Sequence, residues 1–310
     1  MNPATPTSGP PPRAGPRARS SATDPAHRRA ALTLAFCAVC WSIAGVVTRH
    51  LEGAAGFEVT FWRSVFCGIT VLAVLTWRTR GAPLTAIRRM GAPGLFSGAM
   101  WALMFICFMV ALNLTTVANT LLVISVSPLL AALLAWAVLG ERPTPATWLA
   151  IAAAGIGIWW MVREAVAAEG ALGMLVALGV PVAASFNVIT MRKHHARIDL
   201  VPAVLLGAVL SGLVTAPLAV PFAATTADLW LLALLGVVQL AIPCMLMVGT
   251  NRHLAPHEVS LIAMLEVVLG PIWAWLGAGE AVGIATLQGG LVVLAALVFN
   301  VFFGGSRRSA

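Results

Sequence analysis

Charge-free stretches long enough to cross a bilayer recur along this chain of 310 residues, and they constrain its fold more than any other feature. A hydrocarbon core of roughly 30 Å requires about 20 helical residues. Stretches of this kind run over 30–48, 94–140, 143–162, 170–191, 200–227, 229–251 and 281–306. Only 10% of the residues are charged, against about 25% in soluble domains, so lipid must solvate much of the surface.

The number of transmembrane helices follows from these stretches. The stretch 94–140 is too long for one helix and has a polar break at 113–116, so it is expected to hold two. Two further helices carry one charge each, 59–77 with Arg63 and 259–279 with Glu266. The predicted fold class is therefore an all-α polytopic membrane protein with ten transmembrane helices.

The basic residues predict how these helices are oriented. With the N-terminus in the cytoplasm, 16 of the 19 Lys and Arg residues are cytoplasmic, Arg63 lies within a helix, and only Arg49 and Arg163 lie outside. This asymmetry is the positive-inside rule, and it accounts for the net charge of +8 without nucleic-acid binding. Both termini are expected in the cytoplasm. The Lys-poor, Ala- and Arg-rich composition favours a bacterial inner membrane.

The two ends of the chain are predicted to be tails. Residues 1–29 are rich in Pro, Ser, Ala and Arg and have no apolar periodicity, which indicates a disordered cytoplasmic segment. The apolar run that follows resembles the front of a signal peptide. It is long enough to span the membrane, however, and no convincing cleavage site follows it, so we expect a first transmembrane helix. Residues 306–310 form the C-terminal cytoplasmic tail.

An internal repeat divides the chain. Its matching residues, at a constant offset of 139, are Ala135-Trp136, Gly140-Glu141 and Thr147 in the first copy and Ala274-Trp275, Gly279-Glu280 and Thr286 in the second. The expected units are 30–165 and 166–305, with five helices each. An odd number of helices inverts the second copy. In transporters built this way the substrate site lies near the midplane between the halves.

Short motifs occur in a fixed order along both halves. They are Phe61-Trp62-Arg63, Ser127-Pro128-Leu129, Leu139-Gly140-Glu141, Gly155-Ile156, Leu265-Glu266-Val267, Gly270-Pro271-Ile272-Trp273-Ala274-Trp275 and Gly279-Glu280. With these motifs the chain resembles the EamA-type transporters of the drug/metabolite transporter superfamily over about 30–305. Many members carry Glu-Pro in the ninth helix, whereas here Val267 follows Glu266. The resemblance implies a cavity lined by helices 1–4 and 6–9, and alternating access without ATP.

Two charged residues within helices are the first candidates for the binding or coupling of a substrate. A central acid such as Glu266 costs roughly 2.5–3.5 kcal/mol to insert, so it must face a cavity or a partner. It could bind a cationic group or couple transport to protons; the structural alternative is a buried pair, and we favour the functional role. Arg63 could bind a substrate carboxylate or extend to the outer interface, and the sequence does not decide between these.

Polar and aromatic residues within the helices extend the candidate substrate site. The polar candidates are Ser42, Asn187 and Gln239, although most such groups only bridge helices. Trp41 and Trp101 could form an aromatic wall for an organic solute, and the alternative is that they anchor the helices at the membrane interface.

A further group of residues is predicted to hinge or gate the helices. Pro128 and Pro271 are expected to break the fourth and ninth helices, as hinges or as tolerated kinks. The repeat-matched Glu141 and Glu280 lie in turns, where capping is favoured over gating. Thr144-Pro145 after Glu141 predicts a helix start with Thr144 as N-cap.

The function expected from these features is secondary transport of a small organic solute, with export favoured over uptake. Protons are a candidate coupling ion, and a homodimer is left open. An intramembrane enzyme would need a nucleophile, a base and usually a metal cluster at one depth, and Glu266 has no such companions. A non-transporting scaffold or receptor would need a large extramembrane domain as a partner surface, and the sequence predicts none. We find no nucleotide-binding, hydrolase or H-E-x-x-H motif in context and expect no cofactor.

Overall fold

The computed structural model describes residues 25–167, 170–193, 201–250 and 256–303, and all regular elements in these ranges are helices. The first half contains α1 (Pro25–Ser42), α2 (Ala44–Thr48), α3 (Phe57–Arg78), α4 (Pro83–Arg89), α5 (Gly91–Leu114), α6 (Val117–Ile124), α7 (Ser127–Leu139) and α8 (Pro145–Ala167). The second half contains α9 (Ala171–Ala177), α10 (Gly179–Lys193), α11 (Val201–Thr215), the 3₁₀ turn η1 (Ala216–Leu218), α12 (Thr226–Leu234), the π-helix η2 (Leu235–Ala241), α13 (Ile242–Thr250), α14 (Pro256–Ala278) and α15 (Ile284–Phe303).

The helices are long and apolar enough to cross a membrane. Nine helical segments of the described residues meet this condition, and several of them join two or three consecutive helices end to end. These composite segments are Pro25–Thr48, Val117–Leu139, Ala171–Thr190, Val201–Leu218 and Thr226–Met247. In α14 the apolar part among the described residues is the shorter Ile262–Ala278. The tenth transmembrane helix, expected over 259–279, therefore stays a prediction.

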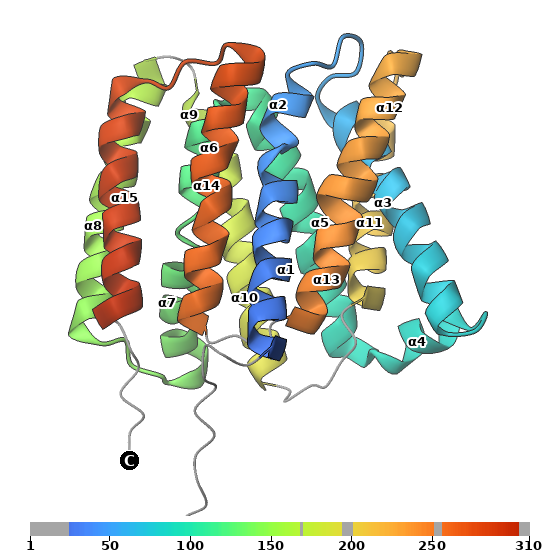
Figure 1. Cartoon of the computed structure of the whole chain (residues 1–310), viewed down its shortest axis with the longest axis horizontal. Coiled ribbons are helices and arrows are strands. Elements are labelled where there is room, and N and C mark those ends of the chain that lie inside the picture. The colour runs from blue at the N-terminus through green and yellow to red at the C-terminus, as the bar shows by residue number, and fades with distance from the viewer. Residues whose placement is uncertain (1–24, 168–169, 194–200, 251–255, 304–310) are drawn as a thin grey trace, which may run out of the picture.

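Successive helices run in alternating directions through one bundle (Figure 1). The start of α1 and the end of α15 lie at the same end of the bundle, below, as does α4. The helices α2, α9 and α12 lie at the other end, which we call the α2 face. Helices of the first and second repeat units lie next to one another throughout this bundle.

The helix contacts between the two halves form matching pairs. The first helix, α1, packs against α13 and α14, and its repeat counterpart α10 packs against α5 and α7. Likewise α3 packs against η2, and its counterpart α11 packs against α5. The pairs α3–α11 and α8–α15 join equivalent helices of the two halves. The contact pattern is thus unchanged when the two halves are exchanged.

The pair α8–α15 lies at one edge of the bundle (Figure 1). Gly157 and Gly289 allow the close approach, because a Cβ at either position would lie 2.5–2.6 Å from the carbonyl oxygen of the other. Small residues permit such backbone contacts between membrane helices. Beside this contact, α8 and α15 expose large apolar side chains such as Ile156 and Leu291.

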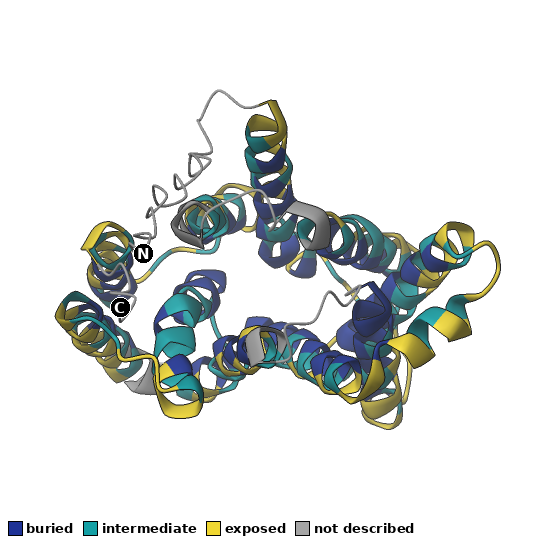
Figure 2. Cartoon of the chain, turned by 90° about the horizontal axis from the view of Figure 1, so that it is seen from below, coloured by how far each residue is buried: buried dark blue, intermediate teal, exposed yellow. Residues whose placement is uncertain are grey.

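Residues on the outer sides of the bundle are exposed and residues between the helices are buried (Figure 2), and many of the exposed residues are large and apolar. Leu213 on α11 and Trp230 on α12 are examples, with exposed fractions of 66% and 76%. Since a water-exposed surface of this composition would aggregate, these sides are suited to contact lipid.

The polar break at 113–116 separates two helices, as predicted: α5 ends at Leu114 and α6 begins at Val117. Thr116 caps α6, because its side chain accepts a hydrogen bond from the N–H of Asn119 at 3.1 Å. At the start of the chain, α1 begins at Pro25, so the tail predicted over 1–29 is too long by five residues. The helix extends past the apolar run because its first turns need no lipid. Residues 1–24 and 304–310 lie outside the described ranges.

Pro128 and Pro271 differ in their effect on the helices. The fourth helix is broken between α6 and α7, with Pro128 in the first turn of α7. There the hydroxyls of Ser125 and Ser127 donate to the carbonyls of Leu122 and Ile124 at 2.7 and 2.6 Å, which helps to satisfy acceptors at the end of α6. At Pro271 α14 is continuous, so its helical hydrogen bonding is not broken as it is at Pro128, and the roles of Pro271 as hinge or tolerated kink stay predictions. Because Pro271 has no backbone N–H, α14 lacks one intrahelical hydrogen bond there.

Candidate functional site

Arg63 on α3 lies at the centre of a polar cluster between the two halves. Its side chain is buried, with 2% of the residue exposed. Its Nε and Nη2 donate to the side-chain oxygen of Gln239 at 3.1 and 2.8 Å. Arg63 therefore points into the bundle, and the alternative of extension to the outer interface is excluded by this geometry.

The π-helix η2 brings Gln239 to Arg63. Pro243 follows four residues later and lacks the N–H that would bond the Gln239 carbonyl, which disturbs regular α-helical pairing at this point. Gly236 allows η2 to approach α3 closely, because a Cβ there would lie 2.7 Å from the Arg63 carbonyl oxygen. π-Helical segments occur frequently at functional sites.

Aromatic rings surround the Arg63 guanidinium. Its central carbon lies 5.8 Å from the ring centre of Phe105 and 5.5 Å from that of Phe108, both on α5. Trp101, one turn earlier, packs its ring against Phe105 with 5.6 Å between centres. Cation–π contacts of this kind stabilise a buried guanidinium where water is excluded.

Three polar atoms near this cluster are buried without a hydrogen-bond partner in the described part of the chain. They are Nη1 of Arg63, Nε1 of Trp101 and Oγ1 of Thr60. Leaving a buried donor unpaired costs about 1–3 kcal/mol, and more when it is charged. The site therefore retains hydrogen-bonding capacity that a bound molecule with acceptor atoms could use.

Trp41 and Ser42 connect the cluster to α1 and α14. The Trp41 carbonyl accepts a hydrogen bond from Nε2 of Gln239 at 3.4 Å. The Ser42 hydroxyl accepts a hydrogen bond from Nε1 of Trp273 at 3.0 Å. The tryptophan ring at 41 is half-buried and packs against the core around Trp101, so both predicted tryptophans are near the cluster.

Glu266 on α14 is half-buried and attracts Arg63 electrostatically. Among the described residues its carboxylate forms no hydrogen bond and no ion pair within 4 Å. The structural alternative of a directly bonded pair is therefore not found in these residues. The acid and the guanidinium belong to opposite halves and interact electrostatically.

Asn187 forms a separate contact. Its side-chain oxygen accepts a hydrogen bond from the Ser97 hydroxyl at 2.7 Å, which joins α10 to α5. Ser97 lies one helical turn before Trp101, on the same side of α5. Of the predicted site residues, Arg63, Gln239, Trp41 and Trp101 thus form one contact network, with Glu266 and Ser42 beside it and Asn187 a turn away.

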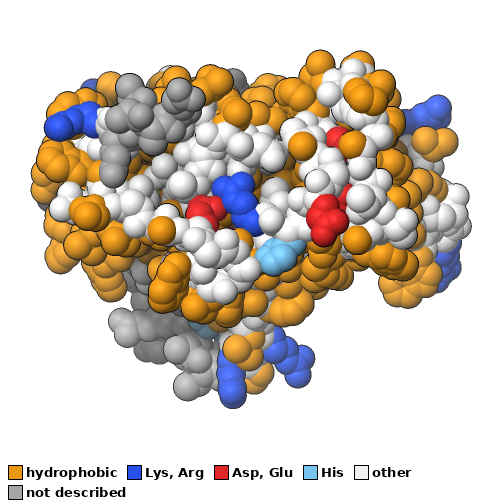
Figure 3. Space-filling view, turned by 90° about the horizontal axis from the view of Figure 1, so that it is seen from above, with side chains coloured by type: hydrophobic (Ala, Val, Ile, Leu, Met, Phe, Trp, Pro, Cys, Tyr) orange, Lys and Arg blue, Asp and Glu red, His pale blue; other side chains and the backbone are white. Residues whose placement is uncertain are grey.

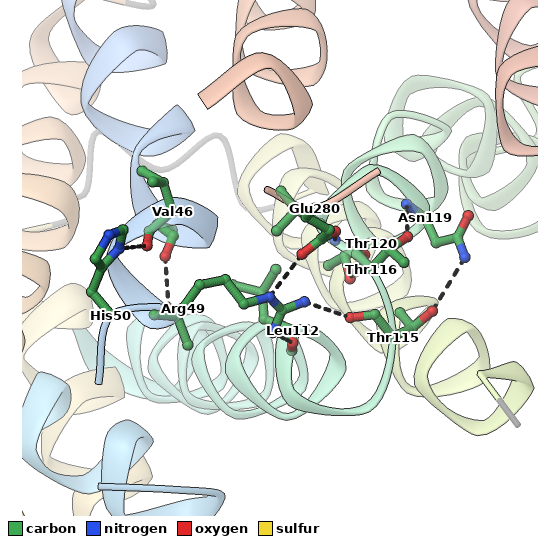
Figure 4. A network of polar contacts seen from close by, with 12 residues as sticks. Val46, Arg49, His50, Leu112, Thr115, Thr116, Asn119, Thr120 and Glu280 are labelled. Atoms are coloured by element: carbon green, nitrogen blue, oxygen red, sulfur yellow. Dashed lines mark hydrogen bonds and ion pairs between the residues drawn. The ribbon is translucent and has the colours of Figure 1, made fainter. Parts of the chain in front are cut away.

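A second charged cluster occupies the α2 face (Figure 3). Arg49, directly after α2, forms an ion pair with Glu280 in the α14–α15 loop, with 2.7 Å between Nε and Oε2. The same guanidinium donates to the carbonyls of Leu112 and Thr115 at 2.7 and 3.0 Å (Figure 4). The second oxygen of Glu280 accepts the N–H of Val117 at 2.6 Å.

Glu141 and Glu280 have matching backbones in the two repeats. Each follows a glycine with a left-handed φ, +73° at Gly140 and +66° at Gly279, which no other residue type adopts as readily. In both, the glutamate N–H bonds the carbonyl six residues earlier, at 3.4 and 3.1 Å. Next to Glu141, the predicted N-cap is confirmed, since Thr144 Oγ1 accepts the N–H of Thr147 at 3.2 Å.

Two further carboxylates on the α2 face bind loop backbones. Asp228 on α12 accepts the N–H groups of Glu52, Gly53 and Ala54 at 2.8–3.1 Å, which attaches the α2–α3 loop to the second half. Glu58 on α3 accepts the N–H groups of residues 223 and 224 at 2.9–3.1 Å. Each half thus holds a loop of the other.

The sequence does not predict roles for Arg49, Glu58, Asp228 or the phenylalanines around Arg63. For Arg49 a signal exists: it is one of only two basic residues on the predicted outer side, where the positive-inside rule disfavours them. An arginine kept against that tendency is a candidate for a specific partner. The phenylalanines have no signal, because a helix rich in apolar residues does not show which of them faces an arginine.

The comparisons with known proteins agree with this architecture. A model of the EamA-like transporter family matches residues 28–163 and 171–302. No curated protein sequence matches the chain. Eleven chains of solved structures match it. One of these, described only as the crystal structure of a protein, has a TM-score of 0.62 at 21% identity and covers 91% of this chain and all of its own. At that identity the likeness shows the fold alone.

Proposed function

The chain belongs to the EamA-like transporter family, and from this premise we propose that it is a secondary transporter of a small organic solute. The solute class is an amino acid, a metabolite or a drug-like compound. Transport proceeds by alternating access without a cofactor, and export is favoured over uptake.

One observation supports the position of the substrate site: a buried arginine of one repeat binds a glutamine of the other and keeps an unpaired donor. Nη1 of Arg63 has no partner among the described residues, and the indole N–H of Trp101 nearby is also free of one. An oxygen acceptor of the solute, such as a carboxylate, would satisfy these donors. The rings of Trp101 and Phe105 would contact its apolar part.

Glu266 supplies the opposite charge in this proposal. Its half-buried carboxylate attracts Arg63 without a direct bond, so a cationic group or a proton can bind there. Binding at Glu266 weakens its attraction for Arg63, which changes the interaction between the two repeats. This gives a physical route from solute or proton binding to a change in repeat orientation.

The repeated helix contacts support two inverted five-helix units around this site. Exchanging the halves leaves the contact pattern unchanged, and the units join through equivalent pairs such as α3–α11. The broken helix α6–α7, with Pro128, is a candidate hinge. Pro271 is a second candidate, because it leaves the Val267 carbonyl without an intrahelical partner.

We place the α2 face outside and the opposite face in the cytoplasm of an inner membrane. Arg78 at the end of α3 and the arginines 88 and 89 of α4 lie on the face opposite α2 (Figure 1). Both termini then lie in the cytoplasm. Thiol labelling of single cysteines at positions 80 and 164 tests this, since they should react from opposite sides.

The test of function is a substrate screen, followed by flux through purified protein in liposomes. Cells lacking and cells overproducing the protein are compared for accumulation of, and resistance to, candidate solutes. For the solute found, Glu266→Gln and Arg63→Lys are expected to abolish flux, and Arg163→Gln, at the bundle edge against Trp159 and Trp160, is the control. Wild-type flux in both site variants would show that the site is elsewhere. No flux of any solute above protein-free liposomes would contradict transport.

A further inference from the structure

We propose that Arg49 and Glu280 form a latch that closes the α2 face between the two repeats and opens during each transport cycle. The inference rests on the proposed transport function and adds a gate to it. The latch consists of Arg49 and Glu280 together with the backbone groups they bind, at Leu112, Thr115 and Val117.

The latch joins three segments that are far apart in the sequence. Arg49 follows the first helical segment, and Glu280 lies in the loop after α14. The backbone groups belong to the end of α5, the start of α6 and the turn between them (Figure 4). All three nitrogens of the Arg49 guanidinium donate hydrogen bonds, and both carboxylate oxygens of Glu280 accept one. Any motion that separates the first helix from the α14–α15 loop must break this set together.

The partners of the latch can be exchanged for water at a modest cost. The Arg49 and Glu280 side chains are 29% and 16% exposed, so water can reach both. The Leu112 carbonyl belongs to the last turn of α5, and the Val117 N–H belongs to the first turn of α6. Such groups have no intrahelical partner and are readily solvated. The pair can therefore alternate between bonded and hydrated states, unlike the buried Arg63–Gln239 contact.

The charges of Arg49 and Glu280 are opposite to the partial charges of the helix ends that they contact. The C-terminus of α5 carries partial negative charge and binds the cation Arg49, while the N-terminus of α6 carries partial positive charge and binds the anion Glu280. The closed state is thus stabilised by the turn between α5 and α6, and a change in that turn would release both side chains.

In this proposal the latch closes the route from the α2 face to the substrate site. Helix α14 contacts both α2 and α6, so elements of both repeats converge there. Below it, Asn119 and Thr286 form a buried hydrogen bond of 2.8 Å between α6 and α15. Ser42 lies seven residues before Arg49, about 10 Å deeper at ~1.5 Å per residue. It is 1% exposed in this closed arrangement.

The first experiment measures access from the α2 side without any substrate. In a variant lacking the five native cysteines, Ser42→Cys is labelled with a membrane-impermeant thiol reagent in vesicles of known sidedness. Adding Glu280→Gln or Arg49→Gln is expected to raise the labelling rate about tenfold, because a charged hydrogen bond contributes about 1.5–3 kcal/mol and 1.4 kcal/mol is a factor of ten. Glu52→Gln is the matched control, since that carboxylate is exposed on the same face and outside the latch.

The second experiment holds the latch shut. Cysteines replacing both Arg49 and Glu280 are joined by a cleavable bifunctional thiol reagent, and flux is measured before and after cleavage. We expect flux to disappear on cross-linking and to return on cleavage. The control is a monofunctional thiol reagent, which modifies the cysteines without joining them. Flux in the control should not change when the cleavage treatment is applied.

The two readouts separate the latch from the proposed function. An unchanged Ser42→Cys labelling rate in both latch variants, with each variant eluting as the folded protein, would overturn the latch even if flux is normal. Undiminished flux in the cross-linked protein would also overturn it. Faster labelling in a protein that carries no solute would instead support the latch and contradict transport.

Discussion

The Arg63 guanidinium and the Gln239 side-chain oxygen meet from opposite repeats, and their two hydrogen bonds of 3.1 and 2.8 Å are buried. Gln239 also donates to the Trp41 carbonyl of the first helix at 3.4 Å. One amide thus links three helices at the contact between the halves. A solute that draws the guanidinium away from Gln239 would loosen this link, which couples binding to the relative position of the repeats.

Replacing Gln239 by leucine tests how strongly this link holds the bundle. The change removes the acceptor for two donors of a buried cation, so we expect the free energy of unfolding to fall by about 3 kcal/mol or more. Gln239→Glu keeps an acceptor in place and should retain most of the stability. Thermal unfolding of both variants in detergent, against wild type, gives the comparison. Equal stability of the leucine variant would mean that water replaces the amide.

Gly236 sets the distance between η2 and α3, and a methyl group there should disturb it. A Cβ at this position would lie 2.5 Å from the Phe66 Cβ and 2.7 Å from the Arg63 carbonyl oxygen. Overpacking of this kind costs about 1–3 kcal/mol, so Gly236→Ala should lower the melting temperature and impair any solute binding. Gly155→Ala is the matched control, because a Cβ there meets nothing within 4 Å. Similar melting temperatures for the two variants would contradict the close approach.

The membrane character and the repeat could be predicted because both are written in long sequence patterns. Charge-free runs give the spans, and the recurrence of Gly140-Glu141 as Gly279-Glu280 corresponds to matching left-handed turns. The burial of Arg63 could not be decided. The position of Arg63 near the start of its helix allowed its side chain to reach either the interior or the interface. The residue that binds it, Gln239, lies 176 residues away in the sequence, in a π-helix that the sequence did not predict.

The consequences of single residues were harder to predict than the spans. A proline predicts a break, but α14 continues through Pro271 while the fourth helix ends before Pro128. At the break before Pro128 the hydroxyls of Ser125 and Ser127 bond nearby carbonyls, and no serine lies beside Pro271. The latch at Arg49 and Glu280 was also missed as a pair, because its partners lie 231 residues apart and come together only through packing.

Asp228 should be important for the stability of the α2 face. Its carboxylate accepts four backbone N–H groups, three from the α2–α3 loop and one from Thr225, the N-cap of α12. Asp228→Asn replaces one acceptor oxygen by a donor that faces N–H groups, which should cost about 2 kcal/mol or more. Faster proteolysis at residues 51–56 in right-side-out vesicles, together with a lower melting temperature, is the expected result. Glu52→Gln, whose exposed side chain leaves those bonds intact, should behave as wild type.

A substitution in the α8–α15 contact should weaken the packing of the two halves but leave the polar cluster around Arg63 intact. Gly157→Leu would force the two backbones apart, since a Cβ alone would already lie 2.6 Å from the Gly289 carbonyl oxygen. Because both helices lie at the edge of the bundle and neither carries Arg63 or Glu266, the change should destabilise the protein by roughly 1–3 kcal/mol without altering those side chains. The apparent affinity for a transported solute should be unchanged, which distinguishes this variant from Gly236→Ala. Binding and melting measured on the same detergent preparations test this. A large loss of affinity with normal stability would show that the edge pair contributes to the site.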